Sequence, residues 1–312
     1  MTEPEVLAEA SGGVGRIRLN RPRAINAINL SMMRQISAAL AEFAADDSVE
    51  LVELTGAGDR GLCAGADVRE LRERALTGGD VAEFFTTEYA LNLMIADYPK
   101  PYRAIMTGIT MGGGMGLSVH GTDRVVDATS TLAMPETQIA IYPDVFVTHL
   151  LARMPGEIGT HLALTGASVN AADAIRLGLA DRCEGPLPEP SEALAGAWIA
   201  ECYGGNNAEE IVARLAEHDD PFAQAAAAEL ERRSPLSVAV SLEALRRAAQ
   251  FPRLVDQYEQ ELTLAVRMAR GAEFIEGVRA QLIDRDRNPK WSHASLAEVS
   301  RAEVLSYFEP LA

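Results

Sequence analysis

The first half of the chain alternates short strand-like runs with amphipathic helical stretches, and this alternation restricts the fold more than any other feature. Strands are expected at residues 15–19, 51–54, 102–106, 124–126 and 132–134. Helices are expected at 28–44 and 81–97. The first of them carries one apolar stripe, made of Met32, Met33, Ile36, Leu40 and Phe43. Alternation of this kind is typical of α/β proteins.

Beyond about residue 143 the strand signal fades and helical patterns dominate. Helices are expected at residues 171–177, 191–202, 208–217, 222–232, 236–249 and 254–269. The segment EGPLPEPSE, 184–192, holds three prolines within five residues, which makes it the best candidate for a linker. We therefore expect an α/β core over residues 1–185 and a helical region over residues 186–312.

Charge and hydropathy restrict the partners of this chain. Lysine and arginine number 28 and aspartate and glutamate 45, so the formal net charge is −17. Such a charge repels nucleic acid and anionic membrane surfaces, and we expect no nucleic acid and no membrane as partner. The first residues lack a basic region followed by an apolar stretch, and no run of about 18 apolar residues occurs. These patterns predict a cytoplasmic protein.

The cysteines and histidines do not form a metal-binding pattern. Cys63, Cys183 and Cys202 lie far apart and lack the C-x-x-C spacing of a zinc site, so reduced thiols are expected. The five histidines form no H-E-x-x-H pair. We expect no metal ion.

Four glycines fall within five residues of the stretch ITMGGGMGLS, 109–118. A glycine inside a regular element costs roughly 0.5–1 kcal/mol relative to alanine, so the cluster indicates a place where side chains would block a close approach. Its spacing matches neither a P-loop, nor a dinucleotide fingerprint, nor a nucleophile elbow. Two interpretations remain. The bare N–H groups of a strand-to-helix turn hold a developing negative charge, or the following helix packs tightly against a sheet.

Two further stretches are candidates for chemistry. LCAGADVREL, 62–71, places small residues in a loop before an expected helix, which offers a second set of amides or an ordinary loop with Asp67 as N-cap. MPETQIAIYPDV, 134–145, holds Glu136 and Asp144 at the margins of an apolar run. Carboxylates in such places suit general acid/base or nucleophilic work, and they also serve as helix or strand caps.

Taken together and in order, these motifs resemble the crotonase (enoyl-CoA hydratase/isomerase) superfamily. The four that carry the resemblance are NRPRAINAI, CAGAD, TMGGGMG and MPE. Within the superfamily the chain is most similar to the 3-hydroxyisobutyryl-CoA hydrolase family. That likeness rests on EYALN at 88–92, ITMGGGMGLSVHG at 109–121, AMPETQIAIYPDV at 133–145 and FIEGVRAQLIDRDRNPKW at 274–291.

The resemblance implies an α/β fold in which residues 1–185 form a crotonase-like spiral of ββα turns with an acyl-CoA site. Residues 186–312 then form a helical C-terminal region that completes the fold and supplies an oligomerisation surface. The expected assembly is a homo-oligomer, and members of the superfamily often build trimers. The expected activity is hydrolysis of an acyl-CoA thioester, 3-hydroxyisobutyryl-CoA in valine degradation, with coenzyme A as part of the substrate and no cofactor.

The resemblance also implies roles for individual residues. The amides of Ala66 and Gly113 would form an oxyanion hole, Glu136 would attack the thioester or activate a water, and Asp144 would orient the water or a substrate hydroxyl. The residues expected to bind the substrate are Glu88, Gly113, Glu136, Asp144, Ala64, Gly65 and Asp67. Four arginines, Arg21, Arg23, Arg69 and Arg72, flank the two loops that would meet the phosphates of coenzyme A, and surface solvation explains these arginines about as well.

Two departures from the family patterns keep alternatives open. Hydratases of the superfamily carry a second catalytic glutamate where this chain has Gly116, and this difference argues against hydration. The hydrolase family has a run of glycines after P-D-V, where this chain has Phe146, Val147, Thr148 and His149. That bulk is expected to narrow the pocket or to redirect the following helix. A thioester hydrolase, an enoyl-CoA hydratase or isomerase, and a non-catalytic acyl-CoA-binding oligomer remain as alternatives.

Overall fold

The computed structural model describes residues 3–311, and its fold is mixed α/β, as the alternation predicts. The chain forms two compact units, each built from three stretches. The first unit contains the residues up to Asp67, Thr86–Ala133 and Ser168–Ser191. The second contains Val68–Phe85, Met134–Ala167 and the residues from Glu192 onward. The domain boundary expected near residue 185 stays a prediction.

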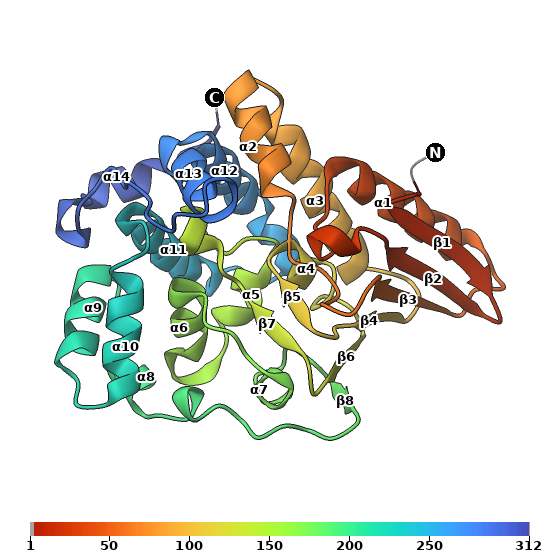
Figure 1. The fold of residues 1–312 in the computed structure, drawn as a ribbon, viewed down its shortest axis with the longest axis horizontal. Helices are drawn as coiled ribbons and strands as arrows, with labels where there is room; N and C mark the ends of the chain where they lie inside the picture. Colours follow the sequence, from red (N-terminus) through yellow and green to blue (C-terminus); the bar gives the residue numbers. More distant parts are fainter. Residues whose placement is uncertain (1–2, 312) are drawn as a thin grey trace. The chain divides into compact units, whose positions relative to one another are not determined.

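A six-stranded sheet with strand order β1-β2-β3-β4-β6-β8 forms the framework of the first unit (Figure 1). Its strands are β1 Val6–Ser11, β2 Val14–Leu19, β3 Leu51–Gly56, β4 Tyr102–Ile105, β6 Asp123–Asp127 and β8 Arg182–Glu184. β1 and β2 are antiparallel because Gly12 and Gly13, both with positive φ, allow a two-residue hairpin turn. The other pairs are parallel. A second parallel pair joins β5, Ile109–Met111, to β7, Thr131–Ala133.

Helix α1, Leu30–Ala45, covers part of this sheet with the apolar stripe that its sequence predicts. Asn29 begins it, since its side chain accepts a hydrogen bond from the amide of Met32. The five stripe residues are all buried. Helix α7, Ala171–Arg176, begins in the same way at Asn170. Local capping and periodicity therefore determine both helices.

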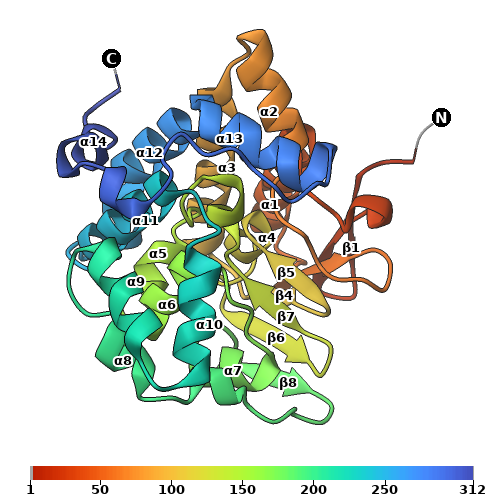
Figure 2. The same cartoon turned by 60° about the vertical axis from the view of Figure 1, so that its left-hand side comes forward.

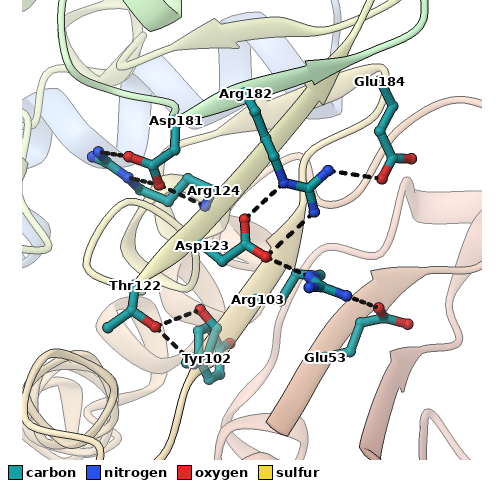
Figure 3. A network of polar contacts seen from close by, with 9 residues as sticks. All are labelled: Glu53, Tyr102, Arg103, Thr122, Asp123, Arg124, Asp181, Arg182 and Glu184. Carbon is teal, nitrogen blue, oxygen red and sulfur yellow. Dashed lines mark hydrogen bonds and ion pairs between the residues drawn. The ribbon is translucent and has the colours of Figure 1, made fainter.

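A row of charges crosses four neighbouring strands of the sheet (Figure 3). Glu53 on β3 faces Arg103 on β4, and Arg103 faces Asp123 on β6. Arg103 Nε lies 2.5 Å from Asp123 Oδ2, and Arg182 Nε on β8 lies 3.0 Å from Asp123 Oδ1. Cross-strand pairs of opposite charge each contribute roughly 0.2–1 kcal/mol, so the row favours one register of these short strands.

The second unit is helical, and in it α6, α8, α9 and α10 lie side by side (Figure 2). Its helices are α2 Val68–Thr77, α5 Val147–Leu151, α6 Ile158–Thr165, α8 Trp198–Cys202, α9 Ala208–Glu217, α10 Pro221–Leu230, α11 Pro235–Ala248, α12 Tyr258–Arg270, α13 Ala272–Val278 and α14 Arg301–Ser306. Helix α3, Val81–Ala96, begins here and continues in the first unit. None of the helices among residues 3–311 is long and apolar enough to span a membrane.

Three expected elements differ from the structure. The helix expected at 191–202 is helical only at its two ends, as a 3-10 turn at Glu192–Leu194 and as α8. Gly196 lies between them, where a Cβ would meet the Trp198 ring at 2.2 Å. The helix expected at 254–269 begins as a 3-10 turn, Leu254–Gln257. Strand β8 lies beyond residue 143, where the strand signal fades and helical patterns were expected to dominate. Its three paired residues leave no periodicity to detect.

Candidate functional site

The glycine cluster forms a tight turn after β5, and we call Gly65, Ala66, Gly112, Gly113 and Gly114 the amide turn. The loop before Ala66 runs beside β5, with Cys63 and Thr110 forming an isolated bridge. A Cβ at Gly114 would lie 2.6 Å from the carbonyl oxygen of Cys63. Gly114 thus allows close backbone packing, which was one of the two interpretations of the cluster. The helix expected after the cluster is a single turn, α4 Gly113–Gly116, so its dipole is small.

The amides of Ala66 and Gly113 lie close together in this turn. A methyl group at Gly113 would lie 3.1 Å from Ala66 N, and one at Gly65 would lie 3.5 Å from Gly113 N. Neither N–H group donates a hydrogen bond to another residue in the part of the chain that the structure describes. Two hydrogen-bond donors without partners among the described residues therefore lie in one turn, an arrangement that suits an anion site.

The buried side chain of Asn26 forms hydrogen bonds with the main chain of the loop that leads to Ala66. Its Nδ2 donates to the carbonyl oxygens of Ala57, Gly61 and Leu62 at 3.0, 3.2 and 3.1 Å. Reasoning from residue types alone missed this role, although Asn26 lies within the quoted motif NRPRAINAI. Asp67, one of the expected binding residues, lies 3.0 Å from Arg21 through its Oδ2.

Ala64 is exposed, whereas Gly65 is buried. Their roles in binding, like that of Asp67, stay predictions.

Helix α3 presents Glu88 and Asn92 on one face, since they are four residues apart. Both side chains are buried. A methyl group at Gly113 would lie 2.6 Å from Glu88 Oε1, so Glu88 contacts the amide turn. Neither Oδ1 nor Nδ2 of Asn92 has a hydrogen-bond partner among residues 3–311. Leaving a buried side-chain amide without hydrogen-bond partners costs free energy. The cost indicates that a group other than residues 3–311 forms hydrogen bonds with Asn92.

Glu136 and Asp144 are both buried in the second unit, at the two ends of one loop. Glu136 begins a 3-10 turn, Glu136–Ile139, whose position depends on two glycines. A Cβ at Gly166 would lie 2.9 Å from Pro135 Cα, and one at Gly277 would lie 2.7 Å from Ile139 Cα. The N-cap positions of this turn and of α5 are Pro135 and Phe146. Neither carboxylate therefore occupies an N-cap.

The environment of Glu136 favours its protonated form. Burial, and after it the negative charge of Asp144, raise the pKa of Glu136 well above its ordinary value of 4.5. Its Oε2 accepts no hydrogen bond from any residue in the range 3–311. A carboxyl group with a raised pKa is suited to general acid or base catalysis.

A third carboxyl group, Glu261 on α12, belongs to the same cluster, and the sequence did not reveal it. It is fully buried, and its pKa is raised to about 8 by burial and then by the charge of Asp144. Glu261 and Asp144 are far apart in the sequence, so no local pattern could have shown that they belong to one cluster. We call Glu136, Asp144 and Glu261 the carboxylate cluster.

In the segment 146–149, where the hydrolase family has glycines, the first three residues are buried and His149 is half-buried. Phe146 is fully buried, and α5 begins at the next residue. Both Val145 and Phe146 have positive φ, at 50° and 60°, a region that β-branched and bulky residues rarely adopt. Backbone strain of this kind is often found at functional sites.

Three of the four arginines expected near the phosphates of coenzyme A contact protein groups. Arg21 lies 2.9 Å from Glu5 Oε1 in addition to Asp67. Arg69 and Arg72 donate to the carbonyl oxygens of Leu282 and Ile275. The contact of these arginines with a phosphate stays a prediction.

Comparison with known proteins connects this geometry to a family. A profile of the enoyl-CoA hydratase/isomerase family matches residues 14–185 and 182–308. The 3-hydroxyisobutyryl-CoA hydrolases of Gallus gallus and Homo sapiens mitochondria are 36% and 35% identical to this chain. Each alignment covers 98% of the chain and 89% of the relative.

Two solved structures are similar over nearly their full length. A carnitinyl-CoA dehydratase from Mycobacterium thermoresistibile has a TM-score of 0.94 and 42% identity, covering 98% of this chain and 97% of its own. An enoyl-CoA hydratase from Rhodobacter sphaeroides 2.4.1 has a TM-score of 0.93 and 38% identity, covering 99% and 98%. The fold, the motifs and these relatives agree, and the chain belongs to the enoyl-CoA hydratase/isomerase family of the crotonase superfamily.

Proposed function

We propose that this enzyme hydrolyses an acyl-CoA thioester, with 3-hydroxyisobutyryl-CoA as its substrate in valine degradation. The observation that carries the proposal is the buried Glu136, with its raised pKa beside Asp144, in a chain that has Gly116 where hydratases carry a second glutamate. The names of the relatives that are 36% and 35% identical support the same activity.

The proposed mechanism gives a role to two amides and to two carboxyl groups. The N–H groups of Ala66 and Gly113 stabilise the thioester oxygen as it gains negative charge. The ionised carboxylate of Glu136 either attacks the carbonyl carbon or removes a proton from the attacking water, and Asp144 orients that water or the substrate hydroxyl. The C–S bond then breaks, and coenzyme A leaves as a thiolate that takes up a proton. In the route by direct attack, water then hydrolyses the anhydride between Glu136 and the acyl group, which releases the acid and restores the carboxylate.

A second candidate function is hydration or dehydration of an acyl-CoA. The observation that favours it is the similarity to a dehydratase and a hydratase at 42% and 38% identity. Against it stands Gly116, because addition of water across a double bond in this superfamily uses two carboxylates.

The deciding experiment follows free thiol release from 3-hydroxyisobutyryl-CoA and from 3-hydroxypropionyl-CoA beside water addition to crotonyl-CoA. We expect thiol release to have the larger kcat/KM. Faster water addition would support the second candidate. Absence of both reactions, with acyl-CoA still bound in calorimetry, would support a non-catalytic binding protein.

We further propose that Asn92 binds the hydroxyl group of the substrate. Its buried amide has no partner among residues 3–311, and it lies one helical turn after Glu88. Asn92→Leu is expected to raise KM for the 3-hydroxyacyl substrates by roughly 10-fold, a loss of about 1.4 kcal/mol. KM for the propionyl analogue, which lacks the hydroxyl, should change by less than about two-fold on the same scale. Equal losses for both substrates would contradict this role.

A further inference from the structure

Glu261 contacts four polar groups, three of which lie on the loop that carries Asp144. Its Oε1 accepts from Thr148 Oγ1 and from Gln257 Nε2, both at 2.9 Å. Its Oε2 lies 2.9 Å from Tyr142 Oη and 3.3 Å from the amide nitrogen of Phe146. Three of these four partners lie within the segment 142–148. One buried side chain thus fixes both sides of Asp144.

The hydroxyl group of Tyr142 indicates which form of Glu261 fits these contacts. Its oxygen lies 3.0 Å from the main-chain carbonyl oxygen of Glu261 and 2.9 Å from Oε2. A carbonyl oxygen only accepts, and a tyrosine hydroxyl has one hydrogen to donate. When that hydrogen goes to the carbonyl, the contact with Oε2 requires a hydrogen on Oε2. This arrangement accommodates a neutral carboxylic acid. The hydrogen bonds from Thr148, Tyr142 and the Phe146 amide act to lower the pKa of Glu261, but burial and the charge of Asp144 outweigh them.

The charges around Glu261 favour the same form. Within residues 3–311 no lysine or arginine forms an ion pair with it, and Asp144 is the charged group that raises its pKa after burial itself. Tyr142, Thr148, Gln257 and the Phe146 amide are uncharged near neutral pH. His149 approaches Gln257 Oε1 through Nδ1, and burial and Arg153 lower the pKa of that histidine, which favours its neutral form.

The segment that Glu261 contacts is strained. Val145 and Phe146 follow Asp144 directly, and both have positive φ. Such residues cost of order 1–3 kcal/mol each and persist only where their surroundings hold them in place. The hydrogen bonds to the Phe146 amide and to Thr148 are contacts of this kind, because they join the strained turn to helix α12.

We propose that Glu261 is a positioning residue which, in its protonated form, holds the strained turn at 145–146 and so places Asp144 for the reaction. The positioning of Asp144 for catalysis rests on the proposed function. The protonation of Glu261 and its hold on the turn do not.

Two substitutions test the role in catalysis. Glu261→Gln keeps the shape and an N–H donor for Tyr142, so kcat for thiol release at pH 7 should stay within about five-fold of wild type, the effect of losing one neutral hydrogen bond. Glu261→Leu removes every polar atom, and we expect kcat to fall by about 100-fold, as when a reacting group is misplaced by 1 Å. KM should change by less than about three-fold in both variants. Equal damage from the two substitutions would overturn the proposal.

A second measurement needs no substrate. The pKa of about 8 for Glu261 lies above its ordinary value of 4.5, so its contribution to stability is fully present below pH 4.5 and is lost as the pH rises to 8. Glutamine does not titrate. The Tm of Glu261→Gln minus that of wild type should therefore rise between about pH 5 and 8 and level off above about pH 8.5. A flat difference would show that Glu261 is ionised in the folded protein and would overturn the proposal.

Glu243→Gln is the matched control. Glu243 on α11 is also buried, but it forms ion pairs with Arg247 and Arg301 at 2.6 and 2.7 Å. Burial acts to raise its pKa, but these arginines outweigh burial and lower it below the ordinary value. The Tm difference for this variant should be flat from about pH 6 to 9. Should wild type release no thiol, the proposed function fails, and the pH dependence of Tm still decides whether Glu261 is protonated.

Discussion

Replacing Gly113 with alanine keeps the N–H group but is expected to lower kcat for thiol release by about 10²–10³-fold, as much as the loss of one oxyanion donor, because the added methyl group would displace the substrate oxygen from that N–H. The new methyl group would lie 3.1 Å from Ala66 N and 2.6 Å from Glu88 Oε1, so it would occupy the space that the proposed mechanism assigns to the substrate oxygen. Gly113 is not among the residues with positive φ, so its backbone conformation suits alanine, but the Glu88 side chain must move to make room for the methyl group. Steady-state release of free thiol measures the effect.

The matched control for this variant is Gly204→Ala. A Cβ at Gly204 would meet no atom within 4 Å, so its activity should equal that of wild type. Thermal unfolding of both variants separates a blocked site from a damaged fold. Wild-type activity in Gly113→Ala would mean that the amide turn does not contact the substrate oxygen.

Replacing Glu136 with glutamine is expected to lower kcat by about 10²–10⁴-fold, the contribution typical of a general acid or base. The same substitution should make the protein more stable relative to wild type as the pH rises. The raised pKa of Glu136 means that its contribution to stability is fully present below its ordinary pKa of 4.5 and is lost as the pH rises through the folded value. Glutamine avoids this loss, so the Tm of the variant relative to wild type should be higher at pH 8 than at pH 5.

The pH dependence of the wild-type enzyme provides a second measurement of this role. Only the ionised form of Glu136 attacks a carbonyl or accepts a proton, so kcat/KM should rise with pH. The midpoint of that rise should lie above the ordinary carboxyl pKa of 4.5. Glu217→Gln, at an exposed position near the end of α9, should leave both activity and its pH profile unchanged. Full activity in Glu136→Gln would exclude Glu136 from the chemistry.

The elements that local sequence determines agree closely with the structure. Helix α9 spans Ala208–Glu217, as its periodicity predicts, and Asn207 caps its first turn. The apolar stripe of α1 is buried. Both features depend on residues within one or two helical turns of each other. Periodicity and capping residues are therefore enough to predict where such a helix lies and which face it buries.

The elements that distant contacts determine could not be predicted. Strand β8 has three residues and is a strand because it pairs with β6. Glu261 joins the carboxylate cluster from more than 100 residues away, as the separation of 115 residues from Phe146 shows. Asn92 is distinguished by the absence of partners among residues 3–311, which only coordinates reveal. The homo-oligomer, the cytoplasmic location and the absence of a cofactor stay predictions.

The order in which the chain supplies its second unit has a consequence during synthesis. Helix α2 packs against α12 and α13, and Ala272, where α13 begins, follows the last residue of α2, Thr77, by 272 − 77 = 195 residues. At about 5–20 residues per second, ribosomes need roughly 10–40 s to make that length. Throughout this interval Leu71, buried in the finished protein, lacks these partners. Helix α2 is therefore a segment that nascent-chain chaperones would meet early and shield until α12 and α13 have been made.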